Sequence, residues 1–554
     1  MDDFMMTPRH CFGRYVLVLT LLLAGTIAAQ NRTMGLMYHD STRSYQGYTL
    51  LAPMPYDVVY LIDNEGRQVH SWDAPPSPDL SVYLLEDGNL LRTAHYSPAR
   101  SKVEILDWDG NLKWGFDYHA DSVHQHHDIE MLPNGNIVMV AWETRTTQEA
   151  VEAGRNPSTI YDGLKPEHLI EVDTSTGAIV WEWHAWDHLV QDFDSTKQNF
   201  GVVRDHPELI DINYNRRNHP DIMHVNAVDY NAEFDQLIIS PRAYSEVWVI
   251  DHSTTTEEAR GHIGGRYGRG GDLLYRWGNP ETYDRGDTLR HRLYYQHDAQ
   301  WVPDSVSGAG RLLVYSNGSN NRAVRQWSSV EEWQPPIDSL GCYHLGPDST
   351  YGPEEPTWWY RDTVEFYSDF ISGCQRLPNG NTLICEGGWG TLFEVTPDSE
   401  VVWQYISPVC SSGPMHQGVP MSYRLNSVFR CYRYSPDYPA FEGRNLTPGG
   451  PIELPPAGLL TGGENVVPRV TGPTVVPSAA RHQVSFGFSL SDEGRVELAV
   501  FDSQGRLVDE VLDGTRPAGR HRVLWRAGGL PAGTYFCHFS TEASSATRRF
   551  TVVR

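Results

Sequence analysis

Short apolar segments, each divided by an Asx-Gly pair, recur along the chain. These pairs are Asp87-Gly88, Asn134-Gly135 and Asn379-Gly380. An Asx-Gly pair supplies the positive φ angles that a two-residue hairpin turn needs, so each segment is predicted to form two antiparallel strands. Residues 224–242 and 297–318 have the same apolar form with different loops. The chain is therefore expected to be all-β.

Each unit of this repeat continues with a third, apolar strand and a fourth strand that carries a tryptophan. The tryptophans are Trp72, Trp114, Trp181, Trp277, Trp358 and Trp403. Six units of about 40 to 95 residues, each with four strands, predict a six-bladed β-propeller. The first unit lacks an inner strand, and residues 426–434 (NSVFRCYRY) are expected to return and supply it. A β-helix would need shorter and more even rungs, and a string of sandwiches would need Greek-key spacing and more linkers.

The first residues have the composition of a secretory signal. Arg9 and Arg14 precede an apolar run of about fifteen residues, and small residues follow that run. The run is too short to cross a bilayer comfortably, and no later stretch approaches the necessary length. We therefore expect residues 1–29 to be a signal peptide and the exported chain to have no transmembrane segment.

A change in composition divides the rest of the chain. The propeller is expected over residues 30–437. Residues 438–469 are rich in proline and glycine, which is typical of a linker. Residues 470–554 carry a second series of short strands, which predicts a C-terminal β-sandwich.

The net charge of the chain excludes one class of partner. Binding to nucleic acids depends largely on Lys and Arg side chains that displace counterions from phosphates. This chain has 44 Lys and Arg against 70 Asp and Glu, a formal charge of -26. DNA and RNA are therefore not expected as partners.

Export would permit disulfides among the cysteines that remain after Cys11 is removed. A two-residue turn at Asn379-Gly380 places Cys374 opposite Cys385. Cys410 with Cys431, on either side of a late loop, is an equally open pairing.

Histidines recur where the first strands of the middle units begin. The segments are His126-His127-Asp128, His224-Val225-Asn226 and His297-Asp298. The innermost strands of a propeller line its central channel, so their ends bring such residues together at one mouth. A neutral imidazole there can act as a nucleophile while nearby cations stabilise an anion. Arg242 and Arg322 lie just beyond second strands, where they would reach that anion.

Two further motifs suggest other sites. HQHH at residues 124–127 suggests a metal, but alternation along a strand sends His126 and His127 to opposite faces, so no metal or other cofactor is expected. GGRYGRGG at residues 264–271 is similar to a phosphate-binding loop. It joins a third strand to a fourth and opens no helix, so it is predicted to be a hairpin loop.

The last 85 or so residues resemble the immunoglobulin-like C-terminal sorting domain of type IX secretion cargo. The positions that carry the resemblance are Gly505, Gly519, Trp525, Gly533 and Tyr535. By this resemblance, two of the glycines serve turns and the two aromatic residues pack the core. The tail then directs the chain through the outer membrane of a Gram-negative bacterium, with the type IX machinery as partner, to the cell surface or the medium.

Residues 35–435 resemble the bacterial arylsulfate sulfotransferase family. The most specific segments are QHDAQ at residues 296–300 and SNGSNNR at residues 316–322. The resemblance implies a six-bladed propeller that moves a sulfuryl group from a phenolic sulfate ester to a phenolic acceptor. The reaction runs without the nucleotide donor PAPS, through a sulfohistidine. By position, His224 and His297 match the family's channel histidines, Arg322 its sulfate-binding arginine and Arg242 its second-strand SxR pattern.

The candidate site follows from these matches and from the histidines that recur where the first strands of the middle units begin. The expected catalytic residues are His224, His297, Arg322 and His127, and the expected substrate-binding residues are Arg242, Asn226, Asp298, His126 and Asn317.

One departure from the family leaves the nucleophile open. The family's nucleophilic histidine is expected in the inner strand after QHDAQ, where this chain has Ser372-Gly373. Either His224 or His297 takes that role, His416 substitutes for it, or the transferase activity is lost. The rival hypothesis is a non-catalytic propeller that binds a glycan, a sulfated ligand or a protein at the cell surface. A metal-dependent lyase or hydrolase is less favoured.

Overall fold

The computed structural model divides the chain into two units, residues 1–459 and 460–554. The residues that it describes are 32–54, 56–97, 100–160, 162–215, 219–318, 326–456, 471–476, 479–480, 483–490, 494–516, 519–527, 530–541 and 545–552. The predicted signal peptide and Arg322 lie outside the described residues. The all-β prediction is confirmed: strands dominate both units, and the helices are short.

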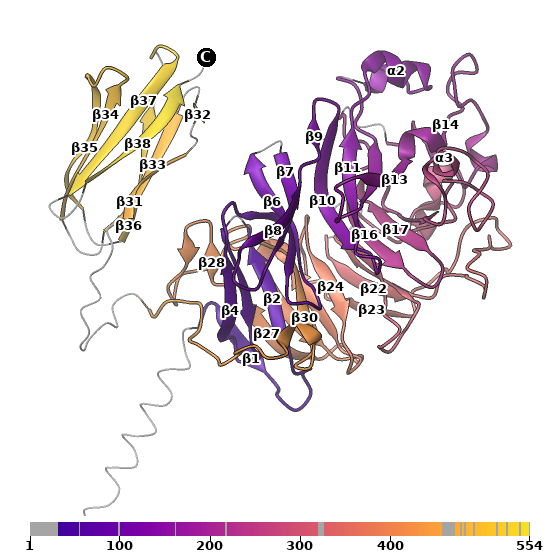
Figure 1. Ribbon diagram of the computed structural model, residues 1–554, viewed down its shortest axis with the longest axis horizontal. Helices are drawn as coiled ribbons and strands as arrows, with labels where there is room; N and C mark the ends of the chain where they lie inside the picture. Colours follow the sequence, from indigo (N-terminus) through magenta and orange to yellow (C-terminus); the bar gives the residue numbers. More distant parts are fainter. Residues whose placement is uncertain are drawn as a thin grey trace, which may run out of the picture. The chain divides into compact units, whose positions relative to one another are not determined.

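Antiparallel sheets of four or five strands make up the first unit (Figure 1). From the first strand outward they are β30 Val428–Tyr434, β2 Tyr48–Pro53, β3 Val58–Ile62 and β4 Gln68–Asp73; β5 Pro78–Leu84, β6 Leu90–Ser97, β7 Arg100–Leu106 and β8 Leu112–Phe116; β10 Val123–Met131, β11 Ile137–Glu143, β12 Glu167–Val172 and β13 Ile179–His184, with β9 His119–Ala120 beside β10; β16 Val225–Asn231, β17 Gln236–Pro241, β18 Val247–Asp251 and β19 Tyr275–Trp277; β20 His297–Trp301, β21 Leu312–Ser316, β22 Ser329–Trp333 and β23 Trp358–Arg361; and β24 Gly373–Arg376, β25 Thr382–Glu386, β26 Thr391–Val395 and β27 Val401–Ile406, with β1 Gly35–His39 outermost.

Shorter elements connect these sheets. They are α2 Thr147–Glu152, α3 Thr256–Ala259, β14 Leu189–Val190, β15 Ile210–Asp211, β28 Val409–Cys410, β29 Gly413–Pro414 and the 3-10 turns η1 Pro157–Thr159, η2 Ala185–His188, η3 Val203–Asp205, η4 Arg242–Tyr244, η5 Pro280–Tyr283, η6 Thr288–Arg290, η7 Gly387–Trp389 and η8 Pro439–Phe441. Within the described part of the chain, every helix is too short or too polar to cross a membrane.

In each sheet, the strand named first above is called its first strand. The first strands of the sheets contact one another in a closed order, which makes the unit propeller-like. β30 contacts β5, β5 contacts β10, β10 contacts β16, β16 contacts β20, β20 contacts β24, and β24 contacts β30. β30 also pairs with β2 in antiparallel register, with Leu50 opposite Tyr432. The late strand therefore returns to the first sheet, as the sequence predicts.

Tryptophans of the fourth strands join neighbouring sheets. The indole of Trp72 in β4 donates to the carbonyl of Asp107, which follows β7 of the next sheet. Trp403 in β27 donates to the carbonyl of Asn64, which follows β3 of the first sheet. Buried indoles need such acceptors. The last of these bonds fastens the final sheet to the first.

The Asx-Gly turns contain one more residue than the sequence analysis expects. Leu85 donates its N–H to the carbonyl of Asn89, so three residues form the loop, and Gly88 has a positive φ of 83°. Three-residue hairpins of this kind place a glycine in the left-handed region.

The same loop length shifts the register of β24 and β25. Cys374 lies opposite Ile384, and Cys385 lies opposite Gly373, so the predicted pairing of the two cysteines is wrong. The six cysteines of the described residues are free thiols, and Cys410 and Cys431 belong to different apolar clusters.

The second unit consists of two sheets around one apolar core. The first has the order β31 Thr471–Val476, β33 Gln483–Leu490 and β36 Gly519–Arg526, and the second has the order β32 Ala479–Ala480, β38 Ser545–Val552, β37 Gly533–Thr541, β34 Gly494–Asp502 and β35 Leu507–Arg516. Phe486, Trp525 and Tyr535 are buried in this core. Gly505 has a positive φ in the turn between β34 and β35, and Gly533 begins β37.

Candidate active site

Three of the predicted histidines lie in or beside neighbouring first strands. His127 belongs to β10, and His224 immediately precedes β16; their ring centroids are 4.6 Å apart with an interplanar angle of 77°. His297 begins β20. Burial holds the pKa of His127 well below its ordinary value, and the charges of His224 and His297 act in the same direction. We group the three imidazoles as the histidine cluster (His127, His224 and His297), because the first two rings are in contact and His297 is near enough to act electrostatically on His127.

The contact of His224 with Asp221 fixes which ring nitrogen carries the proton in the neutral ring. Its Nδ1 lies 2.5 Å from Oδ2 of Asp221, and a carboxylate oxygen accepts, so Nδ1 carries the proton. The other ring nitrogen, Nε2, is then an unprotonated base when the ring is neutral. The side chain is 29% exposed. In its neutral form His224 thus has an unprotonated Nε2 on a partly exposed side chain.

His297 is oriented by an amide. Nδ2 of Asn317 donates to the backbone carbonyls of Ser368 and Ile371, which turns its Oδ1 toward Nδ1 of His297 at 2.6 Å. An amide oxygen only accepts, so Nδ1 of His297 is protonated and Nε2 is free. Burial, followed by the charge of Arg242, holds the pKa of His297 well below its ordinary value. This ring is neutral at pH 7, and it is far less exposed than His224.

His126 and His127 meet, although strand alternation predicts that they point to opposite faces. Nδ1 of His126 lies 2.7 Å from Nδ1 of His127. His127 has a positive φ of 53°, and the register of β10 with β11 shifts between Gln125 and Ile129. This irregularity breaks the alternation and turns both rings toward one another.

A buried carboxyl group continues this contact. Nε2 of His126 lies 3.0 Å from Oε2 of Glu167 in β12, whose Oε1 accepts the N–H of Val225. Burial raises the pKa of Glu167 well above its ordinary value and lowers that of His126, because it disfavours both charged forms. Glu167, His126 and His127 therefore form a hydrogen-bonded chain that leads from the interior to the histidine cluster.

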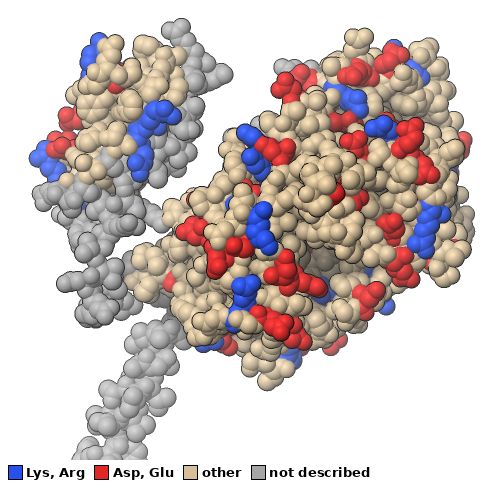
Figure 2. All heavy atoms as spheres, in the orientation of Figure 1, with Lys and Arg blue, Asp and Glu red and all other residues tan. Residues whose placement is uncertain are grey.

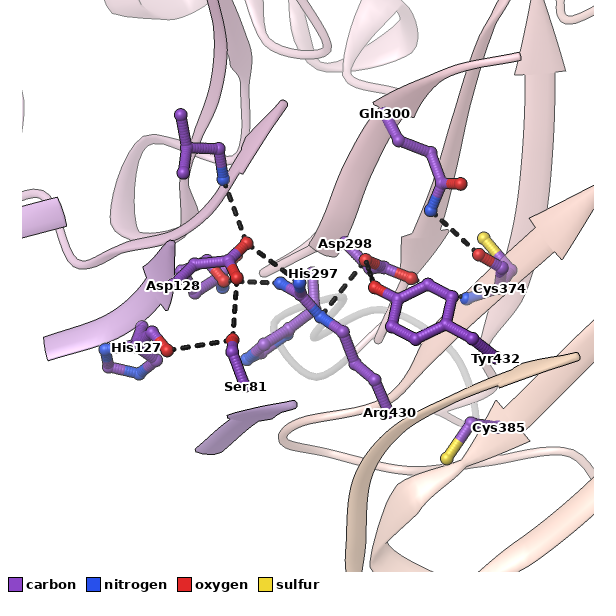
Figure 3. Close-up of polar contacts among 12 residues, drawn as sticks. Ser81, His127, Asp128, His297, Asp298, Gln300, Cys374, Cys385, Arg430 and Tyr432 are labelled. Carbon is purple, nitrogen blue, oxygen red and sulfur yellow. Dashed lines mark hydrogen bonds and ion pairs between the residues drawn. The ribbon is translucent and has the colours of Figure 1, made fainter. Parts of the chain in front are cut away.

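An arginine that the sequence analysis did not single out lies at the centre of the first strands (Figure 3). Arg430 of β30 forms buried ion pairs with Asp128 of β10 at 2.8 Å and with Asp298 of β20 at 3.0 Å. It also donates to the carbonyl of Asn226 in β16 and to the hydroxyl of Tyr83 in β5. The only signal in the sequence is the presence of Arg430 and Arg433 within an otherwise apolar and aromatic strand.

Asp128, Asn226 and Asp298 occupy equivalent positions in three first strands. Their side chains connect adjacent first strands. Asp128 accepts the N–H of Val228 at 3.0 Å, and Asp298 accepts the N–H of Cys374 at 2.8 Å. The amide of Asn226 donates to a backbone carbonyl of the segment that precedes β20. All three side chains are buried. The carboxylates of Asp128 and Asp298 and Nδ2 of Asn226 bond to neighbouring strands, whereas Oδ1 of Asn226 is buried without a hydrogen-bond partner among the described residues.

One of the two predicted arginines is placed. Arg242 follows β17, and its guanidinium lies 4.4 Å from the ring centroid of Tyr295. Its charge acts on His297. Arg430, by comparison, forms ion pairs with two carboxylates. Figure 2 shows many acidic side chains on the face in view, as the net charge requires. Arg242 therefore supplies positive charge locally in an acidic protein.

The position where the family's nucleophilic histidine is expected, Ser372-Gly373, is occupied by buried small residues. The hydroxyl of Ser372 accepts the N–H of Gly387 at 2.9 Å, and the side chain is fully buried. A Cβ on Gly373 would lie 2.4 Å from Oδ2 of Asp298. His416 is exposed and contacts the carbonyl of Pro455 through Nδ1 at 2.6 Å. Among the described contacts of His416, none reaches the histidine cluster.

Comparison with known proteins gives one family. The arylsulfotransferase (ASST) family profile matches residues 40–408. No curated protein matches the sequence. Among solved structures, a protein of unknown function from Bacteroides caccae is 12% identical, covering 70% of this chain and 99% of its own, with a TM-score of 0.37. A virginiamycin B lyase from Staphylococcus aureus is 10% identical, covering 67% and 88%, with a TM-score of 0.31. These scores are too low to bear on function.

Proposed function

The chain belongs to the arylsulfotransferase (ASST) family, and we propose that it moves a sulfuryl group from a phenolic sulfate ester to a phenolic acceptor. A six-bladed propeller supplies the scaffold; the closed order of first strands and the indole bonds between sheets support it. The sulfuryl group is carried by a histidine between the two half-reactions. The observation that carries this proposal is the contact of His224 Nδ1 with Asp221, which leaves Nε2 unprotonated in the neutral ring of a partly exposed side chain.

His224 is the nucleophile in this proposal. Its Nε2 forms a bond to sulfur while the bond from sulfur to the aryl oxygen breaks, and the donor leaves as a phenolate. Arg242 stabilises the negative charge that develops on oxygen. His297 has the same tautomer but is buried, so it is better placed to orient the sulfuryl group than to attack it.

His127 exchanges a proton with the phenols. When Glu167 is ionised, Nε2–H of His126 donates to Glu167 and Nδ1–H of His127 donates to His126, which leaves Nε2 of His127 free. A proton that an acceptor phenol gives to this Nε2 is passed through two shifts to Glu167. The reverse shifts protonate the leaving phenolate. The raised pKa of Glu167 suits it to hold this proton.

The test is a turnover assay with a chromogenic aryl sulfate and a phenol acceptor, combined with mass spectrometry of the enzyme after donor alone. The proposal requires phenol release, transfer to the acceptor and a sulfuryl adduct on histidine. The absence of all three in a folded protein would overturn it.

A binding role without turnover has one observation in its favour. Ser372 is buried and hydrogen-bonded at the position where the family's nucleophile is expected. If sulfated glycans or aryl sulfates bind to the wild-type protein, lose affinity on Arg242→Ala and are never cleaved, this second function is the correct one.

Two segments, residues 1–29 and the second unit, are the basis for proposing that the chain is exported. Residues 1–29 would act as a signal peptide. The sandwich of the second unit, with Trp525 and Tyr535 in its core, would act as an immunoglobulin-like sorting domain for type IX secretion in a Gram-negative bacterium. Deletion of residues 470–554 should then retain the propeller inside the outer membrane. Normal release of the truncated chain would contradict this role.

A further inference from the structure

Two histidines and an aspartate meet outside the histidine cluster. His188 ends η2 after β13, His262 follows α3, and Asp272 precedes β19. Nδ1 of His188 and Nδ1 of His262 each lie 2.8 Å from the same atom, Oδ1 of Asp272. The two ring centroids are 5.8 Å apart with an interplanar angle of 87°, so both nitrogens point at the carboxylate. We call these three residues the His188 cluster.

The hydrogen bonds of His188 leave one nitrogen for a cation. Its Nε2 lies 2.8 Å from the carbonyl oxygen of Ala259, which only accepts, so Nε2 carries a proton. In a neutral ring Nδ1 then has a lone pair that faces the lone pairs of Asp272. A metal ion between Nδ1 and Asp272 removes this repulsion and leaves the imidazole neutral.

The surroundings fix His188 in the position of a ligand. A bond from the outer ring nitrogen to a backbone carbonyl is the usual support of a metal-binding histidine. The indole of Trp183 lies parallel to the imidazole, with centroids 5.7 Å apart and an angle of 5°. A Cβ on Gly271 would lie 2.6 Å from Nε2 of His188, so only glycine fits beside this ring.

We propose that His188, His262 and Asp272 bind a divalent transition metal, with Zn²⁺ as the ion best suited to two imidazoles and a carboxylate. Two ligand atoms of a tetrahedral zinc are roughly 3.4 Å apart, so each 2.8 Å contact would open by roughly 0.6 Å. The His262 side chain is 60% exposed, which leaves a fourth position open to water.

The site would join two neighbouring sheets at their outer edge. His188 follows the last strand of the third sheet, whereas His262 and Asp272 flank the GGRYGRGG loop of the fourth. This loop opens no helix, as the sequence analysis expects. Its glycines allow close approach to His188 and to the backbone of residues 258–261. The loop therefore serves a metal site in this proposal, rather than a phosphate.

A second group of potential ligands is a poorer candidate. His168, Glu182 and His184 also lie close together. The two imidazoles of that group are stacked, with centroids 4.1 Å apart and an angle of 18°. Lone pairs in nearly parallel planes do not converge on one ion, so the His188 cluster is favoured.

The experiment measures zinc retained by the tag-free, full-length exported chain after gel filtration. The variants are His262→Ala and Asp272→Asn in the cluster and His184→Ala in the rival group. His344→Ala is the matched control, because His344 is similarly exposed (67%) and also lies near an aspartate, Asp338, at 3.0 Å. We expect wild type and His344→Ala to retain one zinc more per chain than His262→Ala and Asp272→Asn.

Thermal unfolding gives a second measurement. Zinc at a hundredfold excess over its Kd should raise the unfolding temperature of wild type by about 3 °C and leave that of His262→Ala unchanged. Equal zinc contents in wild type and His262→Ala, or loss of zinc only in His184→Ala, would overturn the proposal. His262 is exposed, so loss of folding does not confound this variant.

Discussion

Arg430 and Asp128 are 302 residues apart in the sequence and form a buried ion pair of 2.8 Å. Asp298 binds the other side of the same guanidinium. The strand that closes the ring of sheets is thus fixed to the third and fifth sheets by charge as well as by its register with β2. Removal of one partner from such a pair leaves an uncompensated buried charge, which is far more destabilising than the loss of a surface pair.

Arg430→Met is therefore expected to lower the free energy of unfolding of the first unit by about 3–5 kcal/mol. Arg100→Met is the matched control, because Arg100 pairs with Asp117 at the exposed surface, and a loss of about 0–1 kcal/mol is expected. Urea denaturation of both variants checks this difference. Similar losses in the two variants would show that the buried network does not stabilise closure.

Asp221→Asn tests the tautomer of His224. An asparagine keeps the size of the side chain but no longer requires the proton to be on Nδ1, so Nε2 is no longer held as the free base. We expect kcat for aryl sulfate turnover to fall by roughly 10²-fold or more with little change in unfolding temperature. The control is Asp235→Asn, in which the carboxylate partner of His252 is changed outside the cluster. A wild-type kcat for Asp221→Asn would remove the reason for choosing His224.

Glu167→Gln tests the proton chain. A glutamine cannot store a proton, so donors with poor leaving groups, which need protonation, should lose far more rate than donors that leave as stable phenolates. Glu143→Gln, in the same sheet and beside His184, should alter both classes equally. The readout is the slope of rate against the pKa of the leaving phenol. An unchanged slope in Glu167→Gln would exclude Glu167 from proton transfer.

Buried histidines should make the fold sensitive to acid. Burial lowers the pKa of His291 to about 4 and that of His168 to about 3, whereas both groups take up protons near pH 6.5 in the unfolded chain. The unfolded state therefore binds more protons below about pH 6.5, and the free energy of unfolding falls as the pH is lowered from there toward 4. The decline is at most about 1.4 kcal/mol per pH unit for each histidine.

His168→Phe should reduce this decline, while His95→Gln, at an exposed site, should leave it unchanged. Denaturation at several pH values between 7 and 4.5 measures both slopes. If the slope of His168→Phe equals that of wild type, His168 is not held neutral by the fold.

Local signals in the sequence predict much of the fold. Asx-Gly pairs mark the hairpins, tryptophans mark the fourth strands, and an apolar segment marks the closing strand. The length of the turns does not follow from the pairs alone, because a single glycine at positive φ also suits a three-residue loop. That one residue moves Cys385 away from Cys374.

The site is only partly readable because its contacts are long-range. The recurrence of histidines where first strands begin reveals His127, His224 and His297, but the contact between His126 and His127 depends on a backbone irregularity that alternation does not predict. Arg430 acquires its partners only when the ring closes. Similarly, Asp298 and the equivalent residues Asp128 and Asn226 form their hydrogen bonds only when adjacent first strands are in place.

The central claim is that His224 carries the sulfuryl group. The most direct measurement is mass spectrometry of the protein after it reacts with an aryl sulfate in the absence of acceptor, with peptide mapping of the adduct. Our account predicts one sulfuryl group on His224, which is absent from His224→Ala and retained in His416→Ala. An adduct on His297 or His416, or an unmodified wild-type protein that still releases phenol, would contradict it.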